Sequence, residues 1–179
     1  MSNKKIILGI DPGLVQTGWG VVYRDGSDVG YVNCGVIRTN ATDTMEARLC
    51  YIYDEITKLL AEYNPNSVAM EEVFINKNFA SSEKLIMARA SAFLAIAKRG
   101  YTINQYRPNE IKKNITGSGH ASKEQVYTMV QKILRTGLMN DNKSHTFDSF
   151  DALAIALTRA FSLTQNVTLR SQAIPCQVA

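Results

Sequence analysis

Residues 6–13, with the sequence IILGIDPG, decide the fold because they place one carboxylate at the point where an apolar strand ends. A run of Ile and Leu is typical of a strand that is buried on both faces. Pro12-Gly13 then turns the chain directly after Asp11. A buried carboxylate is unfavourable unless a positive charge compensates it, and hard divalent cations prefer oxygen ligands. The sequence therefore predicts Asp11 as the first ligand of a metal site.

The composition is that of an ordinary folded domain. The chain has 179 residues, of which 45% are hydrophobic, and its mean hydropathy is −0.13. We expect one domain over residues 1–164 and a disordered tail over 165–179, where hydrophobic periodicity is lost. The apolar stretch near the N-terminus is short and ends at Asp11, so we expect neither a signal peptide nor a membrane span. Three scattered cysteines without a CxxC spacing predict neither a zinc site nor a disulfide framework, and favour a reducing, cytoplasmic compartment.

The positive charge is concentrated in one part of the chain. Residues 98–135 contain eight Lys or Arg against two Glu, whereas the whole chain has a net charge of +4. Such asymmetry indicates a basic face for a polyanion such as nucleic acid. A solvated helical surface would give the same pattern, so charge alone leaves both interpretations open.

The predicted elements describe an α/β fold. Three strands separated by short turns come first, and helices and strands then alternate. This order predicts a mixed five-stranded sheet with helices on both faces. The strands are expected at residues 5–11, 17–24, 29–38, 67–74 and 101–107, and the helices at 44–63, from Ser81 or Ser82 to 99, 108–116, 122–135 and 146–161.

Two pairs of acidic residues are candidates to join Asp11. Glu71 and Glu72 lie in an otherwise apolar strand, so side-chain alternation lets only one of them share a site with Asp11. The alternative is that both lie in solvent at the strand end. Asp148 and Asp151 are three residues apart in the first turn of a helix and therefore share a face. Stabilisation of the helix N-terminus is the competing explanation for this second pair.

Four such carboxylates indicate a particular chemistry. A cluster of this kind can hold two divalent cations, which activate water and stabilise the leaving oxygen in phosphodiester cleavage. Magnesium is the natural choice, because it binds through a few carboxylates together with substrate phosphate oxygens. His120 and His145 are the only histidines. Both are more typical of surface positions than of catalysts, although His145 precedes Asp148 closely enough for a supporting role.

The chain resembles the RuvC family, the bacterial Holliday (crossover) junction endodeoxyribonucleases of the RNase H-like fold. The similarity extends from Ile7 to about Phe161, and its short motifs occur in the order of the family. Each motif is weak alone, and their collinearity makes the resemblance specific. The matching segments are LGIDPG (8–13) with Thr17-Gly18, AMEEVF (69–74), Lys77-Asn78, GSG (117–119) with Ala121, Lys123 and Gln125-Val126, and DALAIA (151–156).

The resemblance implies a catalytic site and a set of DNA contacts. Its strand glutamate aligns with Glu71 rather than Glu72, so the implied catalytic and metal ligands are Asp11, Glu71, Asp148 and Asp151. They would bind two Mg²⁺ ions, which Mn²⁺ can replace. The implied DNA-binding residues are Phe74, Lys77, Arg107, Lys112 and Lys123. Phe74 matches an aromatic residue that contacts unpaired bases, in keeping with the stacking of bases on exposed rings.

The activity implied is Mg-dependent, structure-selective cleavage of four-way DNA junctions during homologous recombination and DNA repair. A homodimer would make paired symmetric nicks, because its two-fold axis matches that of the junction. The partners implied are four-way junction DNA and the RuvA–RuvB branch-migration complex, in the cytoplasm. An apolar stripe formed by Leu85, Ala88, Ala92 and Ile96 is a candidate dimer face, with burial in the monomer core as its alternative.

One departure from the family leaves a second function open. The residues between the two helical acids are Ser149 and Phe150, where the family has small residues. A bulky Phe150 that shifted the helix start would disturb the ligands and favour a catalytically silent junction-binding module. Retention of all four acids argues against that alternative. An actin-like phosphotransferase is a third class, but this chain is too short to supply the second lobe which that fold requires.

Overall fold

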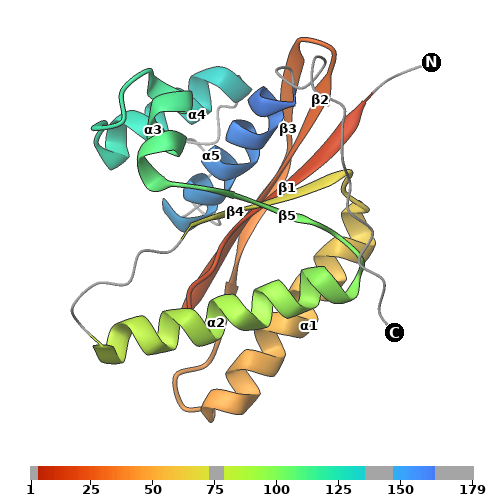
Figure 1. The fold of residues 1–179 in the computed structure, drawn as a ribbon, viewed down its shortest axis with the longest axis vertical. Coiled ribbons are helices and arrows are strands. Elements are labelled where there is room, and N and C mark those ends of the chain that lie inside the picture. The colour runs from red at the N-terminus through yellow and green to blue at the C-terminus, as the bar shows by residue number, and fades with distance from the viewer. Residues whose placement is uncertain (1–3, 73–78, 136–146, 164–179) are drawn as a thin grey trace, which may run out of the picture.

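The computed structural model describes residues 4–72, 79–135 and 147–163, which form one mixed sheet and the helices that cover it (Figure 1). The strand order is β3-β2-β1-β4-β5. The strands are β1 (Lys5–Asp11), β2 (Gln16–Asp25), β3 (Asp28–Arg38), β4 (Ser67–Glu71) and β5 (Ile103–Tyr106), and the helices are α1 (Met45–Tyr63), α2 (Phe79–Lys98), α3 (Pro108–Thr116), α4 (Lys123–Leu134) and α5 (Phe147–Ser162).

The pairing of the central strands brings two acidic residues to one edge of the sheet. Strand β1 is antiparallel to β2 and parallel to β4, with Ile10 opposite Met70 at the end of the β1–β4 ladder. Asp11 and Glu71 are the next residues of the two strands. Because parallel strands end at the same edge, the two carboxyl-bearing residues lie beside each other.

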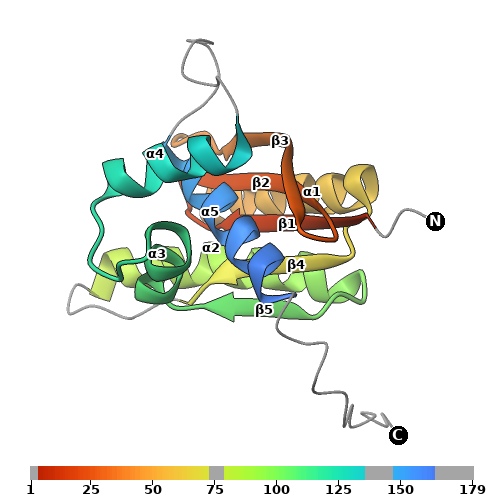
Figure 2. The same ribbon diagram turned by 90° about the horizontal axis from the view of Figure 1, so that it is seen from above.

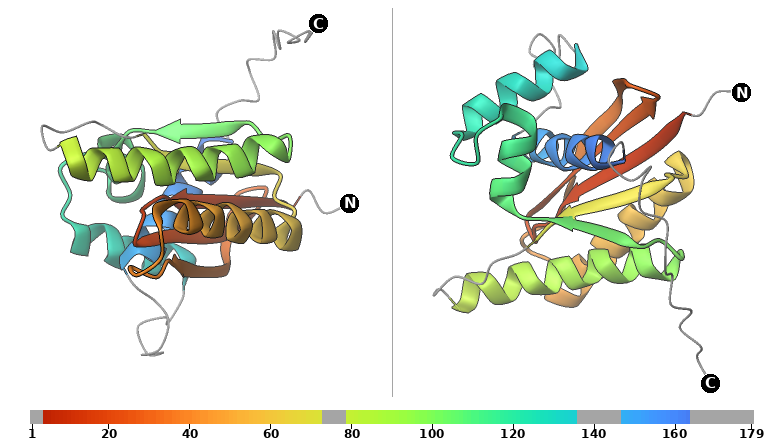
Figure 3. Two further views of the ribbon diagram at one scale, coloured as in Figure 1. Left: turned by 90° about the horizontal axis from the view of Figure 1, so that it is seen from below. Right: turned by 45° about the horizontal axis from the view of Figure 1, so that its top comes forward.

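Helices cover both faces of the sheet, as the sequence predicts. Helices α1 and α2 lie across one face, and α3, α4 and α5 lie on the other (Figures 2 and 3). Alternating strand residues feed two separate cores. Leu8 and Ile10 pack with α1 and α2, whereas Ile7 and Ala69 pack with the helices of the opposite face.

Glycines let α5 approach the sheet backbone closely. A Cβ atom at Gly9 would collide with the backbone of Ala152 and Ala156, and one at Gly18 would collide with the carbonyl oxygen of Asp148. The helix therefore crosses β1 and β2 at a distance that side chains there would prevent. This close packing sets the first turn of α5 against the end of β1.

Most element boundaries agree with the sequence within about two residues, with two exceptions. Strand β4 ends at Glu71, three residues before the end predicted at residue 74. Helix α2 begins at Phe79, before the cap predicted at Ser81 or Ser82. A serine is only a weak helix-start signal, because residues before it can continue the helix. The capping box at Ser122 does open α4, with Gln125 as its partner. Residues 165–179 lie outside the described residues, so the single domain with its tail stays a prediction.

For the apolar stripe on α2 the structure favours the alternative, burial in the monomer core, over a dimer face. Ala88, Ala92 and Ile96 are fully buried in the core beneath the sheet, so they face the monomer interior rather than a partner. Within the described part of the chain, no helix combines the length and the apolar character needed to cross a membrane.

Candidate active site

The turn after β1 holds Asp11 in place. Thr17 is fully buried, and its hydroxyl donates to the carbonyl oxygen of Gly13 at 2.8 Å. The Gly13 N–H donates back to the Thr17 hydroxyl oxygen at 3.2 Å. These two bonds fix the turn that follows Asp11. Sequence reasoning missed this role, although Thr17 belongs to the matching motif.

Three carboxylates from β1 and α5 converge. One oxygen each of Asp11, Asp148 and Asp151 lies within 4.8 Å of the other two. Asp148 lies in the first turn of α5, at the end of the helix that lies against the end of β1, and Asp151 follows three residues later. Carboxylate oxygens at this spacing fit the oxygen coordination that Mg²⁺ prefers.

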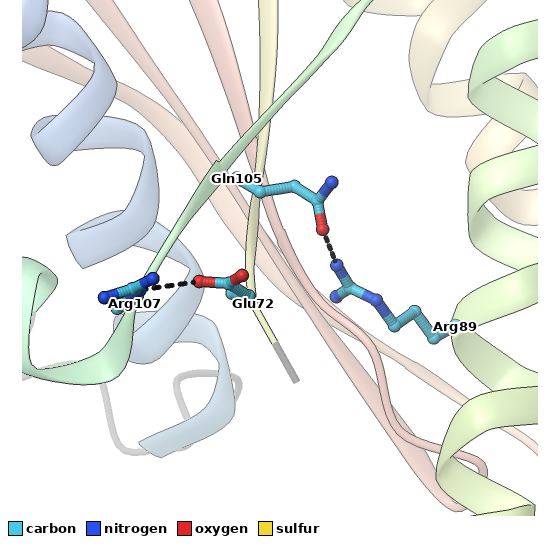
Figure 4. Close-up of polar contacts among 4 residues, drawn as sticks. All are labelled: Glu72, Arg89, Gln105 and Arg107. Atoms are coloured by element: carbon cyan, nitrogen blue, oxygen red, sulfur yellow. Dashed lines mark hydrogen bonds and ion pairs between the residues drawn. The ribbon is translucent and has the colours of Figure 1, made fainter. Parts of the chain in front are cut away.

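Glu71 and Glu72 have different surroundings. Glu71 lines a cavity of about 210 Å³ together with Asp11 and Asp151. Glu72 instead accepts a hydrogen bond from the Arg107 guanidinium, at 3.2 Å between Oε2 and Nε (Figure 4). Glu71 is not among the three acids that lie within 4.8 Å of one another, but Glu71, and not Glu72, lines the cavity with Asp11 and Asp151.

The cluster carries more negative charge than its surroundings neutralise. Burial, followed by the nearby charges of Glu71, Asp151 and Asp148, raises the pKa of Asp11 from 3.8 to about 8. Burial is also the largest cause that raises the pKa of Glu71 and of Asp151. Lys123 opposes these effects without cancelling them. Such a donor set fits a divalent cation, which would supply the missing positive charge.

Two lysines border the acids. Lys123 Nζ lies 3.1 Å from Asp151 Oδ2, and Asp151 is the main cause that raises the pKa of this lysine. Lys112 lines the cavity from α3. The remaining wall is largely apolar and is formed by Pro108, Ile111, Val126, Ala154 and Ile155. Of the other expected DNA contacts, Arg107 bonds Glu72, and Phe74 and Lys77 lie outside the described residues.

Phe150 does not push the helical acids apart. Its side chain is 2% exposed and packs in the core, with its ring centroid 4.1 Å from that of Tyr127. Helical periodicity points Phe150 into the core, whereas Asp148 and Asp151, which are three residues apart, share the face of α5 that is turned toward the acidic cluster. His120 is exposed and is not part of the cavity lining. His145 lies outside the described residues.

A carboxylate cluster at the ends of the two central strands, with helices on both faces of the sheet and lysines beside the acids, defines an RNase H-like nuclease. The family model described as "Crossover junction endodeoxyribonuclease RuvC" matches residues 7–159. The chain therefore belongs to the RuvC family and is a crossover junction endodeoxyribonuclease, a hydrolase.

Relatives and a solved structure agree with this membership. The crossover junction endodeoxyribonuclease RuvC of Orientia tsutsugamushi (strain Ikeda) is 48% identical over 153 residues, which cover 86% of this chain and 93% of the relative. That of Ehrlichia canis (strain Jake) is 44% identical over 156 residues, covering 87% and 96%. The structure "T. thermophilus RuvC in complex with Holliday junction substrate" is 30% identical and covers 90% of this chain and 96% of that one, with a TM-score of 0.81.

Proposed function

We propose that this enzyme resolves four-way DNA junctions by paired symmetric nicks, with Mg²⁺ as its cofactor, in homologous recombination and DNA repair. The observation that carries the proposal is the convergence of Asp11, Asp148 and Asp151 in a chain of the RuvC family. The relative solved with a Holliday junction supports the substrate.

The metal ligands in this proposal are Asp11, Glu71, Asp148 and Asp151. Bound Mg²⁺ supplies positive charge that activates a water molecule and stabilises the leaving oxygen of the phosphodiester. We infer two ions per site, because four carboxylates exceed what one Mg²⁺ with its retained waters requires. Mn²⁺ has the same preference for oxygen ligands and is expected to substitute.

The basic side chains act on the DNA backbone. Lys123 and Lys112 border the acidic cluster, where an ammonium group can offset the charge that develops on the scissile phosphate. The Arg107 side chain is 70% exposed, so phosphate can reach its guanidinium while Nε bonds Glu72. Base stacking by Phe74 and a phosphate contact by Lys77 rest on the resemblance.

The outer face of α2 is our proposed homodimer surface. Ile86 is 41%, Met87 36% and Leu94 57% exposed, which is unusual for three large apolar side chains on one helix. A hollow of about 580 Å³ lies between this face and α1, and its lining is largely apolar: Leu49, Cys50, Tyr53, Asp54, Met87, Ala90, Ser91 and Leu94. Two-fold pairing through such a surface would give one active site for each of two junction strands.

The cellular setting follows from the family. We propose that the enzyme acts in the cytoplasm on junctions delivered by the RuvA–RuvB branch-migration complex. This part rests on membership in the RuvC family rather than on a contact in the structure.

The direct test compares a four-way junction with a linear duplex of matched sequence, each incubated with Mg²⁺ or with EDTA. We expect nicks in the junction alone, and only with metal. Asp11→Asn should keep junction binding and lose cleavage, whereas Asp43→Asn, at an exposed position before α1, should cleave normally. Tight junction binding by the wild type without cutting would instead indicate the silent binding module.

A further inference from the structure

Arg89 of α2 reaches the end of β4 from the face of the sheet opposite to α5. One guanidinium nitrogen donates to the backbone carbonyl oxygen of Glu71, and the other terminal nitrogen donates to Oε1 of Gln105 on β5. Figure 4 shows the side chain extending from α2 toward Gln105, on the other side of Glu72 from Arg107. A single planar group therefore links a helix to the ends of two neighbouring strands.

The carbonyl that Arg89 holds lies where β4 loses one of its two neighbouring strands. The β1–β4 ladder ends at Ile10 opposite Met70, one residue before Glu71. Glu71 is still paired with Tyr106 of β5, and the Glu72 N–H donates to the Tyr106 carbonyl oxygen at 2.7 Å. The backbone that carries the Glu71 carboxylate is thus held by its pairing with β5 and by the hydrogen bond from Arg89.

The Arg89 side chain is itself held in position. Its guanidinium carbon lies 5.3 Å from the centre of the Phe93 ring, a distance at which a cation is attracted to the ring face. It is half-buried, so its freedom is limited. The fork of a guanidinium suits two simultaneous acceptors in fixed directions, which an ammonium group cannot reproduce.

We propose that Arg89 is a positioning residue, which fixes the end of β4 through the Glu71 carbonyl and Gln105 and thereby sets the Glu71 carboxylate for metal binding. This inference rests on the proposed function of Glu71 as a metal ligand. As a positioning residue, Arg89 acts through Glu71 rather than by its own contact with metal or DNA. Residues that orient metal ligands in this way typically change metal affinity by about 10- to 100-fold when they are replaced.

The test measures binding of Mn²⁺ alone to the metal-free full chain, by electron paramagnetic resonance, beside the Mg²⁺ dependence of junction cleavage. Arg89→Met keeps an unbranched apolar stem and removes the guanidinium. We expect it to weaken Mn²⁺ binding about 10-fold and to raise the half-saturating Mg²⁺ concentration equally, at unchanged junction affinity in EDTA. Arg99→Met, at an exposed arginine just after α2, is the matched control and should change neither value.

Two further variants separate geometry from charge and from folding. Arg89→Lys keeps the positive charge but not the forked guanidinium. Its Mn²⁺ affinity should therefore be closer to that of Arg89→Met than to that of the wild type. Gln105→Leu removes only the second acceptor of Arg89, and we expect it to weaken Mn²⁺ binding about 3-fold. This variant tests the proposal even if Arg89→Met fails to fold. Wild-type Mn²⁺ affinity in either Arg89→Lys or Gln105→Leu would overturn the proposal.

A double-mutant cycle shows whether Arg89 acts through Glu71. In a Glu71→Gln background, adding Arg89→Met should weaken Mn²⁺ binding by less than about 2-fold, because the carboxylate that Arg89 positions is gone. An undiminished effect of about 10-fold there, or a loss of junction affinity with normal Mn²⁺ binding, would refute the positioning role. If Glu71→Gln alone left Mn²⁺ binding unchanged, the proposed ligand set would fail instead, so the two failures are distinguishable.

Discussion

Replacement of Asp11 by asparagine should stabilise the metal-free protein, even though it removes the proposed central ligand. Burial and three neighbouring acids raise the pKa of Asp11 from 3.8 to about 8. Between these two values the unfolded chain releases a proton that the folded chain retains, so the free energy of unfolding falls as the pH rises. An asparagine side chain cannot ionise, and Asp11→Asn therefore removes this loss. The stability gap between variant and wild type should widen from about pH 5 to about pH 8 and then level off.

The expected magnitude follows from the pKa of Asp11. The interval from 3.8 to about 8 spans roughly four pH units. At about 1.4 kcal/mol for each unit, the ceiling is about 6 kcal/mol. Water and buffer cations reach the 210 Å³ cavity and screen the acids, so we expect about 1 to 3 kcal/mol at pH 8. Each kcal/mol moves the Tm of a chain of this size by about 2 to 4 °C.

The assay is thermal and urea unfolding of both proteins in EDTA from about pH 5 to about pH 9, repeated with Mg²⁺. Added Mg²⁺ should stabilise the wild type, by about 2.7 kcal/mol at about 100 times its dissociation constant, and should stabilise Asp11→Asn much less. Asp43→Asn changes an exposed aspartate and should follow the wild type throughout. A gap that is absent at pH 8, or that does not grow with pH, would refute the account of Asp11 as an uncompensated buried charge.

Three more predictions concern the packing of α5, the lysine beside the acids and the dimer surface. Gly18→Ala should reduce Mg²⁺ affinity and cleavage by about 10-fold or more in single-turnover assays at varied Mg²⁺ concentration, because the added Cβ displaces the Asp148 carbonyl. Wild-type activity would contradict the close approach of α5 to β2. Lys123→Met should lower single-turnover cleavage about 100-fold at saturating Mg²⁺ while junction affinity changes less than about 3-fold, and equal losses in both would indicate a binding role only. Leu94→Glu should convert a dimer to a monomer in sedimentation equilibrium, and an unchanged mass would show that α2 is not the interface.

The ends of the central strands could be predicted from the sequence because local signals agree there. An apolar run, a terminal aspartate and a Pro-Gly turn mark β1 without tertiary information. Alternation likewise predicts that no more than one of Glu71 and Glu72 shares a site with Asp11. It cannot say which, because that depends on which helices cover which face of the sheet. Only the packing of α5 on Gly9 assigns a face to the Asp11 side.

The surfaces of α2 could not be predicted for a related reason. Apolar residues surround this helix, so periodicity does not separate the stripe that meets the core from the one that meets solvent. Ala92 is buried while Leu94 is 57% exposed, and only the position of α1 beside α2 decides this. Arg89 is a lone arginine in that helix, and no sequence spacing links it to the carbonyl of Glu71.

Cleavage of a supercoiled plasmid that extrudes a cruciform tests the central claim most directly. A single nick relaxes the plasmid and reabsorbs the cruciform, so a linear product requires two nicks within the lifetime of one complex. The account predicts that wild-type protein with Mg²⁺ gives linear plasmid, with ends mapping symmetrically across the junction, and that EDTA or Asp11→Asn abolishes it. Accumulation of nicked circles without a linear product, or cleavage that persists in EDTA, would contradict a metal-dependent enzyme with paired active sites.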